Sequence, residues 1–446
     1  MTGPADHDND PSVPPHSQED ILDALLHGSF PSIRASKADL NQIRATGTLP
    51  TQDDGVAPAN GNQNTSTTKR VLNKIVETLS FGTISKRRFE FAEHVLLGNT
   101  ILLQWHDRKK YLAKEQPFKL ENGLLVTYGQ ICALGGDFFA YKEPICFGKD
   151  AEDQIQRFTW GFESLSTKKN PKAKELAETF IKQKKDEVKA VEAAAQPGSK
   201  VTTDAYYDSF YAKYVAEMLS ALTGFFGTQE KAYLGLSLLN LDHFGADART
   251  AYNAGHTAAL RKAASSKAPK ALEDAYAMNA FADHYLQDSF AAGHLRVPRR
   301  KLYSGSLGRF SKDICAHAMH REDNKAGLHV KNPLGEKWVA FGDSQLLGPD
   351  NSTNLAKCQA ALAVSAAEVF KAWDTAKVPA ASSFGAWQHA PTLESALDPA
   401  NHPPMFNKEG CPRTELLDKT CKTYESMNSL LWTYPTTAVK LLTAKG

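Results

Sequence analysis

The sequence predicts an all-α fold for the central part of this 446-residue chain. Apolar residues recur at helical spacing in successive stretches, and alternating strand-like patterns are nearly absent between residues 200 and 300. The composition, 42% hydrophobic and 9% aromatic, is that of a globular protein with a core. We therefore expect a multi-helix bundle, followed by a C-terminal extension of mixed loop, helix and short strands.

The N-terminal region has a different composition from the rest. Residues 1–85 are rich in Pro, Asn, Ser, Thr and Gly, which predicts a largely disordered segment, apart from a short helix over 18–30. Helical spacing of apolar residues begins in 87–105 and marks the start of a folded domain. The stretch 165–200 is dense in Ala, Lys and Glu, which predicts a long exposed helix inserted in that domain.

Three more amphipathic helices are expected over 208–245, 247–266 and 270–293. After about Val330 the pattern indicates loop and a small hairpin, and a further helix is expected over 354–373. We thus expect a helical domain at 86–330. The remainder, 331–446, is expected to be an extension.

The charge balance excludes partner recognition by the field of the whole molecule. Lys and Arg total 52 against 50 Asp and Glu, a formal net charge of +2. The first twenty residues carry acids and prolines where a Sec signal peptide would have a basic patch and an apolar run. We expect a cytoplasmic protein by default, with secretion or translocation by a specialised system as the alternative. Most of the six cysteines are expected to be free thiols, although Cys411 and Cys421 could bridge a loop.

The segment "HYLQDSFAAGH" carries the first candidate metal ligands. His284 and Asp288 are four residues apart, so on a helix they share one face. His294 lies about 600° of helical rotation beyond Asp288 and would leave that face if the helix continued. Gly293 and Pro298 allow the helix to end and the chain to turn. The spacing is consistent with two ligands on a helix and a third beyond its end.

A single histidine on an apolar helix is more often packed than metal-bound, so the neighbouring motifs decide the interpretation. "NLDHFGADARTAYNAGH" supplies His243 and His256, and "DICAHAMHRED" supplies further histidines and carboxylates. Nitrogen and carboxylate ligands without thiolates suit zinc in a hydrolytic site better than a structural cysteine-rich zinc site.

Together these motifs resemble the zinc-dependent phospholipase C and single-strand nuclease superfamily. The likeness is greatest to bacterial phosphatidylcholine-cleaving phospholipases C of the Pseudomonas fluorescens and Legionella type, in which runs similar to "TYGQICALGGDFFA", "NLDHFG", "YNAGH" and "MHREDNKAGLHV" recur in this order. The resemblance covers roughly residues 90–345 and implies a phospholipase C/P1 nuclease-like bundle holding two or three zinc ions.

Carried over by order, the resemblance implies a set of site residues. The implied zinc ligands are His94, Asp137, His243, His284, Asp288, His294, His320 and Asp323. Asp137 would also bridge two metals and act as general base, whereas without the likeness it would be read as a turn residue beside two glycines. Asp323 is preferred to Glu322 as the carboxylate that follows His320. His256, His317 and Glu322 are candidates for the surrounding shell that orients the ligands.

Two departures place the chain in a side branch of the superfamily. Gln287 stands where Gly or Thr is frequent, and Ala292 stands where Pro is frequent. Members also use an amino group exposed by signal cleavage as a zinc ligand. In a chain without such a signal, that ligand would be either missing or replaced, which bears on the third zinc.

The function implied by the resemblance is hydrolysis of the glycerol-side phosphodiester of phosphatidylcholine to diacylglycerol and phosphocholine, by a zinc-activated water attacking phosphorus. The helical domain at 86–330 would then be the zinc-dependent catalytic domain. The expected partner is a phospholipid membrane surface, without nucleic acid, and docking on that surface is one interpretation of the extension at 331–446. Aromatic residues near the presumed ligands would suit a choline group, although they are more often core: Phe138, Phe139, Tyr141 and Tyr285. A single-strand nuclease, or an inactive binding protein on the same scaffold, is the alternative.

Overall fold

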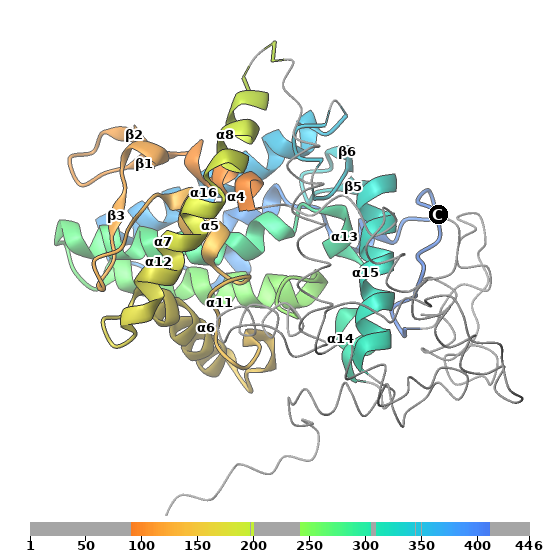
Figure 1. Ribbon diagram of the computed structural model, residues 1–446, viewed down its shortest axis with the longest axis horizontal. Helices are drawn as coiled ribbons and strands as arrows, with labels where there is room; N and C mark the ends of the chain where they lie inside the picture. The colour runs from red at the N-terminus through yellow and green to blue at the C-terminus, as the bar shows by residue number, and fades with distance from the viewer. Residues whose placement is uncertain are drawn as a thin grey trace, which may run out of the picture.

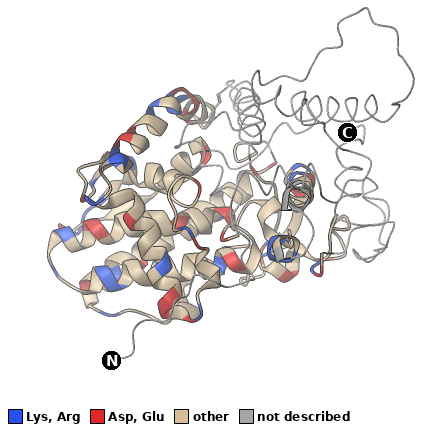
Figure 2. Ribbon diagram, turned by 60° about the horizontal axis from the view of Figure 1, so that its bottom comes forward, with Lys and Arg blue, Asp and Glu red and all other residues tan. Residues whose placement is uncertain are grey.

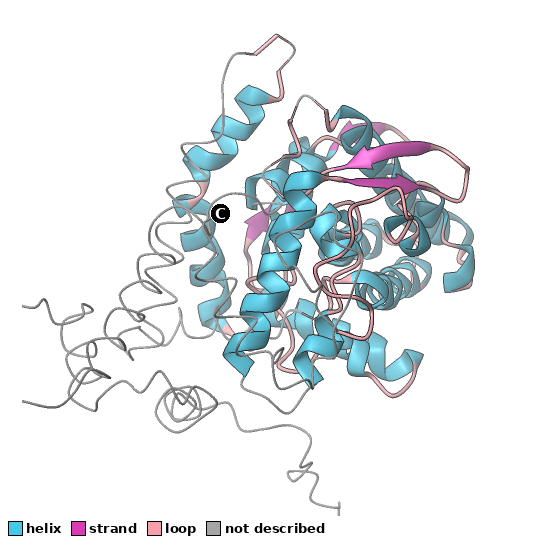
Figure 3. Cartoon of the chain, turned by 90° about the vertical axis from the view of Figure 1, so that its right-hand side faces the viewer, coloured by secondary structure: helices cyan, strands magenta, loops and turns pink. Residues whose placement is uncertain are grey.

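The computed structural model describes residues 91–410, apart from 197, 200–240, 305–308, 344 and 349 (Figure 1). Twelve α-helices and three two-stranded antiparallel sheets make up this described part, so the mainly α-helical class is confirmed (Figure 3). None of its helices is both long enough and apolar enough to cross a membrane. The described part does not include the segment expected to be disordered, 1–85, or the helix expected over 18–30. Of the helix expected over 208–245, it includes only the last few residues.

The centre of the bundle is the helix α12 (Pro269–Asp288). It packs against α11 (Gly245–Ala264), α5 (Tyr128–Leu134) and α16 (Ser352–Thr375). Alanines recur along α12 and are buried, which lets the neighbouring helices approach closely. Because α12 is covered on several sides, the polar side chains of its second half also lie inside the protein: Asn279, Asp283, His284, Gln287 and Asp288.

The stretch with helical spacing at 87–105 is not a single helix in the part that the structure describes, from residue 91 onward. The helix α4 (Phe91–Asn99) ends early, and β1 (Leu102–Gln104) pairs with β2 (Lys110–Leu112) in a hairpin. Asn99, the last residue of α4, contacts α5, because its Oδ1 accepts a hydrogen bond from Gly129 N at 3.1 Å. A second short pair, β3 (Phe118–Lys119) with β4 (Leu125–Val126), follows.

The expected exposed insertion is a pair of helices that contributes to the folded body. After α6 (Ala151–Ser166), α7 (Pro171–Gln183) and α8 (Lys185–Ala194) are separated by a break at Lys184. The helix α8 packs on α4, and its buried Glu187 accepts a hydrogen bond from Ala92 N, in the first turn of α4.

The second half of the chain supplies the remaining elements. Short α13 (Ala292–Leu295) and α14 (Arg299–Ser304) precede α15 (Arg309–Ala326). The small hairpin expected after Val330 is present as β5 (Leu328–Lys331) and β6 (Lys337–Ala340), and α17 (Leu393–Ala396) packs beside β5.

Four cysteines, Cys132, Cys146, Cys315 and Cys358, are buried free thiols, whereas Cys411 and Cys421 lie outside the described residues. Lys and Arg alternate with Asp and Glu along the described helices, in keeping with the balanced charge of the chain (Figure 2).

Candidate metal centre

Asp288, the last residue of α12, lies among four histidines. Its Oδ2 is 2.7 Å from His243 Nδ1 and 3.4 Å from His284 Nε2. Its Oδ1 is 3.5 Å from His294 Nδ1 and 3.7 Å from His94 Nε2. A single buried carboxylate therefore connects imidazoles contributed by four separate segments of the chain.

The first group of candidate ligands is His243, His284 and Asp288. The i, i+4 spacing on α12 places His284 and Asp288 on one face, as the sequence predicts. His243 comes from the segment that leads into α11. The preceding residue, Asp242, holds that segment, because its carboxylate accepts hydrogen bonds from Ile145 N and Cys146 N at 2.7 and 2.8 Å.

The second group is His94, Asp137 and His284, so it shares a histidine with the first. His94 lies on α4, and Asp137 lies in the loop that follows α5. The loop passes so close to the histidine rings that a Cβ on Gly136 would be 2.6 Å from His284 Cδ2. Gly136 also has a φ of 72°, which side-chain-bearing residues rarely adopt, so glycine is required here.

The third group is His294, His320 and Asp343. These residues come from α13, from α15 and from the loop after β6. His320 Nε2 is 3.0 Å from Asp343 Oδ2, and His294 Nε2 is 3.7 Å from the same oxygen. His294 also approaches Asp288, so the third group adjoins the first. We refer to the eight residues of the three groups as the metal centre.

Two histidines of the metal centre are held neutral and in a defined orientation. Burial, followed by the neighbouring His284, lowers the pKa of His94 to about 3, and burial lowers the pKa of His284 to about 4. His94 Nδ1 lies 2.5 Å from Gln287 Oε1, and His284 Nδ1 lies 2.8 Å from the carbonyl of Cys132. Because an oxygen acceptor requires an N–H, the lone pair of each ring is on Nε2, which points into the metal centre.

The metal centre can therefore hold metal ions. Within each group, ligand atoms lie within 4.8 Å of one another, and seven of the eight residues are buried. Neutral imidazoles and carboxylates are ligands for divalent metals, and an outer hydrogen bond to the other ring nitrogen is typical of metal-binding histidines. The donor set contains no thiolate, so it fits the zinc of a hydrolytic site.

The structure brings together seven of the eight ligands named from the sequence: His94, Asp137, His243, His284, Asp288, His294 and His320. Asp323 is not among them. Its buried carboxylate is paired with Arg296, at 2.7 and 3.0 Å, and with His402 Nε2 at 2.9 Å. Arg296, two residues after His294, thus holds Asp323 away from the metal centre.

Two of the three candidates for the surrounding shell, His256 and Glu322, lie outside the three groups. His256 is buried in a separate hydrogen-bonded cluster, with Nδ1 2.6 Å from Asn279 Oδ1 and Nε2 3.0 Å from Glu368 Oε2. Glu322 is half-buried on α15. His317 is on α15 as well, but its side chain lies outside the described part.

Asp343 is the member of the metal centre that the sequence did not indicate. It follows the β5–β6 hairpin, in the region expected to be an extension, and no ligand spacing connects it with a histidine motif. The local signal is weak, since Gly342 and Asp343 also have the composition of an ordinary turn.

The four aromatic residues that are candidates for a choline site pack against different neighbours. Tyr285 and Phe139 are buried, and the Tyr285 ring lies 5.4 Å from that of His243. Phe138 packs against Phe180, and Tyr141 packs against Trp160 with ring centres 4.7 Å apart. These contacts do not form an aromatic cage.

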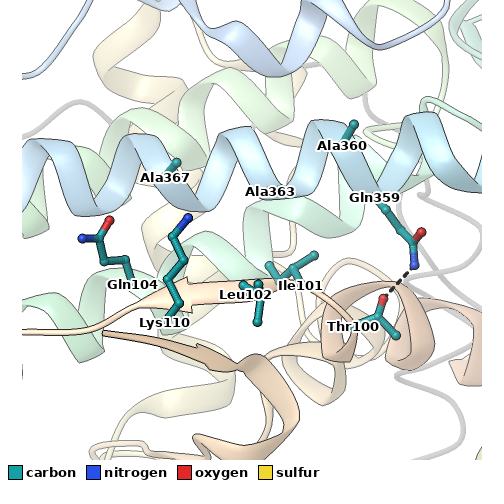
Figure 4. A pocket seen from close by; sticks show the side chains of 9 residues that line it. All are labelled: Thr100, Ile101, Leu102, Gln104, Lys110, Gln359, Ala360, Ala363 and Ala367. Atoms are coloured by element: carbon teal, nitrogen blue, oxygen red, sulfur yellow. Dashed lines mark hydrogen bonds between the residues drawn. The ribbon is translucent and has the colours of Figure 1, made fainter. Parts of the chain in front are cut away.

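A hollow on the surface lies between β1 and α16, as Figure 4 shows. Ile101, Leu102 and three alanines of α16 line it, and a hydrogen bond from Gln359 to Thr100 crosses one end. Its lining includes no histidine or carboxylate, so it has no part in metal chemistry.

Comparisons of this chain with protein-family models, with curated proteins and with solved structures found no match.

Proposed function

We propose that this protein is a zinc-dependent phosphodiester hydrolase, and specifically a phospholipase C acting on phosphatidylcholine. The observation that carries the proposal is the position of Asp288, within 4 Å of four histidines. This carboxylate joins three potential metal groups into one compact centre, as a multi-metal phosphodiesterase requires. The choice of a lipid substrate rests on the sequence resemblance.

Bound zinc would supply positive charge to the phosphoryl oxygens and would lower the pKa of a water molecule toward about 7. The protein's own part is to hold neutral imidazoles and carboxylates in place before substrate arrives. Asp137 is the one residue of the metal centre that is only half-buried. Water and substrate therefore have access on the side of Asp137, which suits it to receive a proton from the attacking water.

The proposed reaction consumes one water molecule. The water oxygen forms a bond to phosphorus as the bond between phosphorus and the glycerol oxygen breaks. The proton released by the water passes to Asp137, and the glycerol oxygen leaves as a hydroxyl after taking up a proton. The products are diacylglycerol and phosphocholine.

A lipid substrate agrees better than a nucleic acid with the surroundings of the metal centre. A single-strand nuclease needs a basic groove that follows the phosphate backbone. Two of the arginines that follow His294 are instead paired with carboxylates: Arg296 with Asp323, and Arg300 with Asp247 at 2.5 and 3.0 Å. These two cations are therefore neutralised before a polyanion could bind.

The test is hydrolysis of phosphatidylcholine vesicles and of single-stranded DNA by the same preparation. Release of phosphocholine that is abolished by a chelator and restored by zinc is the expected result. Cleavage of DNA without release of phosphocholine would overturn the lipid assignment. Purified protein that retains less than about one metal ion per chain, without exposure to chelators, would overturn the metal centre itself.

A further inference from the structure

Asn324 occupies the space between the three residues of the third group, one helical turn after His320 on α15. Its Nδ2 donates a hydrogen bond to Asp343 Oδ2 at 3.1 Å and lies 3.3 Å from His320 Nε2. Its Oδ1 accepts a hydrogen bond from the backbone N–H of Gly293, the residue before His294. One buried amide thus contacts all three segments that supply this group.

Two glycines make room for this amide. A Cβ added to Gly293 would lie 2.5 Å from Asn324 Oδ1, and a Cβ added to Gly342 would lie 1.6 Å from it. Both distances are far below van der Waals contact, so neither position accepts a side chain while Asn324 is in place. The glycines directly precede His294 and Asp343, so the close approach of the amide fixes the backbone next to both ligands.

Arg296 decides which carboxylate reaches the third group, and the amide of Asn324 takes the place beside His320. Asp323, the neighbouring residue on α15, is held by Arg296, and the α15 side chain facing His320 carries no charge. The negative charge in this group comes from Asp343, on a different segment, and Asn324 holds it by donating a hydrogen bond.

We propose that Asn324 is the positioning residue of the third metal group and that it forms an exchangeable amide–carboxylate pair with Asp343. This inference rests on the proposed function insofar as that function requires bound metal. The ligand is Asp343, and Asn324 acts through it and through His294. Because Asn324 Nδ2 already lies near His320 Nε2, a carboxylate oxygen at the same place would face the same ion.

The experiment measures zinc bound per chain and zinc affinity in competition with a chelator, so it does not depend on activity. D343N is expected to lose one zinc per chain relative to the unaltered protein. N324A, which keeps Asp343 but removes its donor, is expected to weaken one zinc site about 10- to 100-fold.

The double substitution N324D/D343N exchanges the amide and the carboxylate, and it is expected to restore the zinc that D343N loses. The same hydrogen bond can form with its direction reversed, and the acceptor for Gly293 N is retained. A purely structural role of Asn324 would not give this rescue, because the unaltered protein and the double variant differ only in which of the two positions carries the carboxylate, and D343N has it at neither.

N354A is the matched control. Asn354 is equally buried, and it accepts a hydrogen bond from Trp338 and donates to the carbonyls of Phe290 and Phe341, but it contacts no residue of the metal centre. It is expected to lower the melting temperature and keep every zinc.

Either D343N or N324A with the zinc content and affinity of the unaltered protein would overturn the inference, as would failure of the double variant to regain zinc while folded. In those cases the other two groups would still bind metal, so the proposed function would stand. An unaltered protein that binds no zinc would overturn both.

Discussion

Two buried polar clusters lie along α12, and they use similar residues in opposite ways. Beside the metal centre is the hydrogen-bonded cluster, which consists of Tyr128, His256, Asn279, Asp283, Ser365 and Glu368. There, donors meet acceptors: the hydroxyls of Tyr128 and Ser365 both donate to Asp283 at 2.7 Å. In the metal centre, lone pairs of imidazoles and carboxylates converge instead.

The difference shows how to tell a structural histidine from a ligand. His256 and His284 are both fully buried and both face carboxylates. His256 lies between an amide oxygen and a carboxylate, so each of its ring nitrogens already has an oxygen partner within the protein. His284 gives its Nδ1 hydrogen to a carbonyl and directs Nε2 to Asp288 and His243, an arrangement that a cation would stabilise.

Of the substitutions that test this contrast between the metal centre and the hydrogen-bonded cluster, D288N is expected to have the largest effect. Loss of the central carboxylate should remove zinc from the whole centre and lower phosphocholine release at least about 100-fold, because metal supplies most of the electrostatic stabilisation. The fold should persist, as circular dichroism would show. D283N is the matched control on the neighbouring stripe of α12 and should keep its zinc. Activity of D288N within a few-fold of the unaltered protein would remove Asp288 from the site.

The second prediction concerns D323N, which separates stability from metal binding. Arg296 would lose its buried carboxylate partner, and breaking a buried pair costs about 3–5 kcal/mol of unfolding free energy. Urea unfolding should detect this loss, while the zinc content measured under native conditions stays complete. A folded D323N protein that lacks one zinc would show that Asp323, rather than Asp343, serves the third group.

A smaller effect is expected from Q287L. Gln287 fixes the ring of His94, and removal of such an outer hydrogen bond typically weakens metal affinity about 10- to 100-fold. The expected result is one weakened zinc site in a chelator titration, with Q287E, which keeps an acceptor, close to the unaltered protein. Equal affinity in Q287L and the unaltered protein would mean that packing alone orients His94.

The smallest effect is a dependence of stability on pH that arises in the hydrogen-bonded cluster. Burial raises the pKa of Asp283 from its ordinary 3.8 to about 7. The native state therefore retains a proton that the unfolded chain has lost between these values. The resulting stabilisation is complete below pH 3.8 and is lost as the pH rises through about 7, by at most about 1.4 kcal/mol per pH unit. Between pH 5 and about 7, the free energy of unfolding in urea should fall with pH more steeply for the metal-free unaltered protein than for metal-free D283N, by up to this amount, and the two profiles should be parallel above about pH 7. Profiles that are parallel below pH 7 as well would mean that Asp283 is ionised throughout.

Sequence spacing predicted the parts of the metal centre that depend on local geometry. The i, i+4 relation of His284 and Asp288 fixes a shared face as soon as α12 is a helix. By contrast, Asp323 and Asn324 both follow His320 on nearly the same side of α15. Which of them faces the centre is decided by Arg296, a contact across segments that spacing does not reveal.

The secondary structure of short apolar runs was also difficult to predict from the sequence. The residues "TILLQW" suit a helix or a strand. They form part of a hairpin, in which Ala113 N donates a hydrogen bond to the carbonyl of Ile101 and Trp105 N donates one to the carbonyl of Lys109. Asp343 could not be predicted from the sequence for a similar reason, because its position depends on how the β5–β6 hairpin returns the chain toward α15.

The late position of Asp343 has a consequence for biosynthesis. Seven members of the metal centre have been translated once the ribosome has passed His320, but the carboxylate of the third group is made only after the β5–β6 hairpin. Because a chain emerges from its N-terminal side, the nascent protein carries an incomplete centre until that point. A product released before the hairpin would lack the carboxylate altogether, so loading of the third group reports that synthesis has passed residue 343.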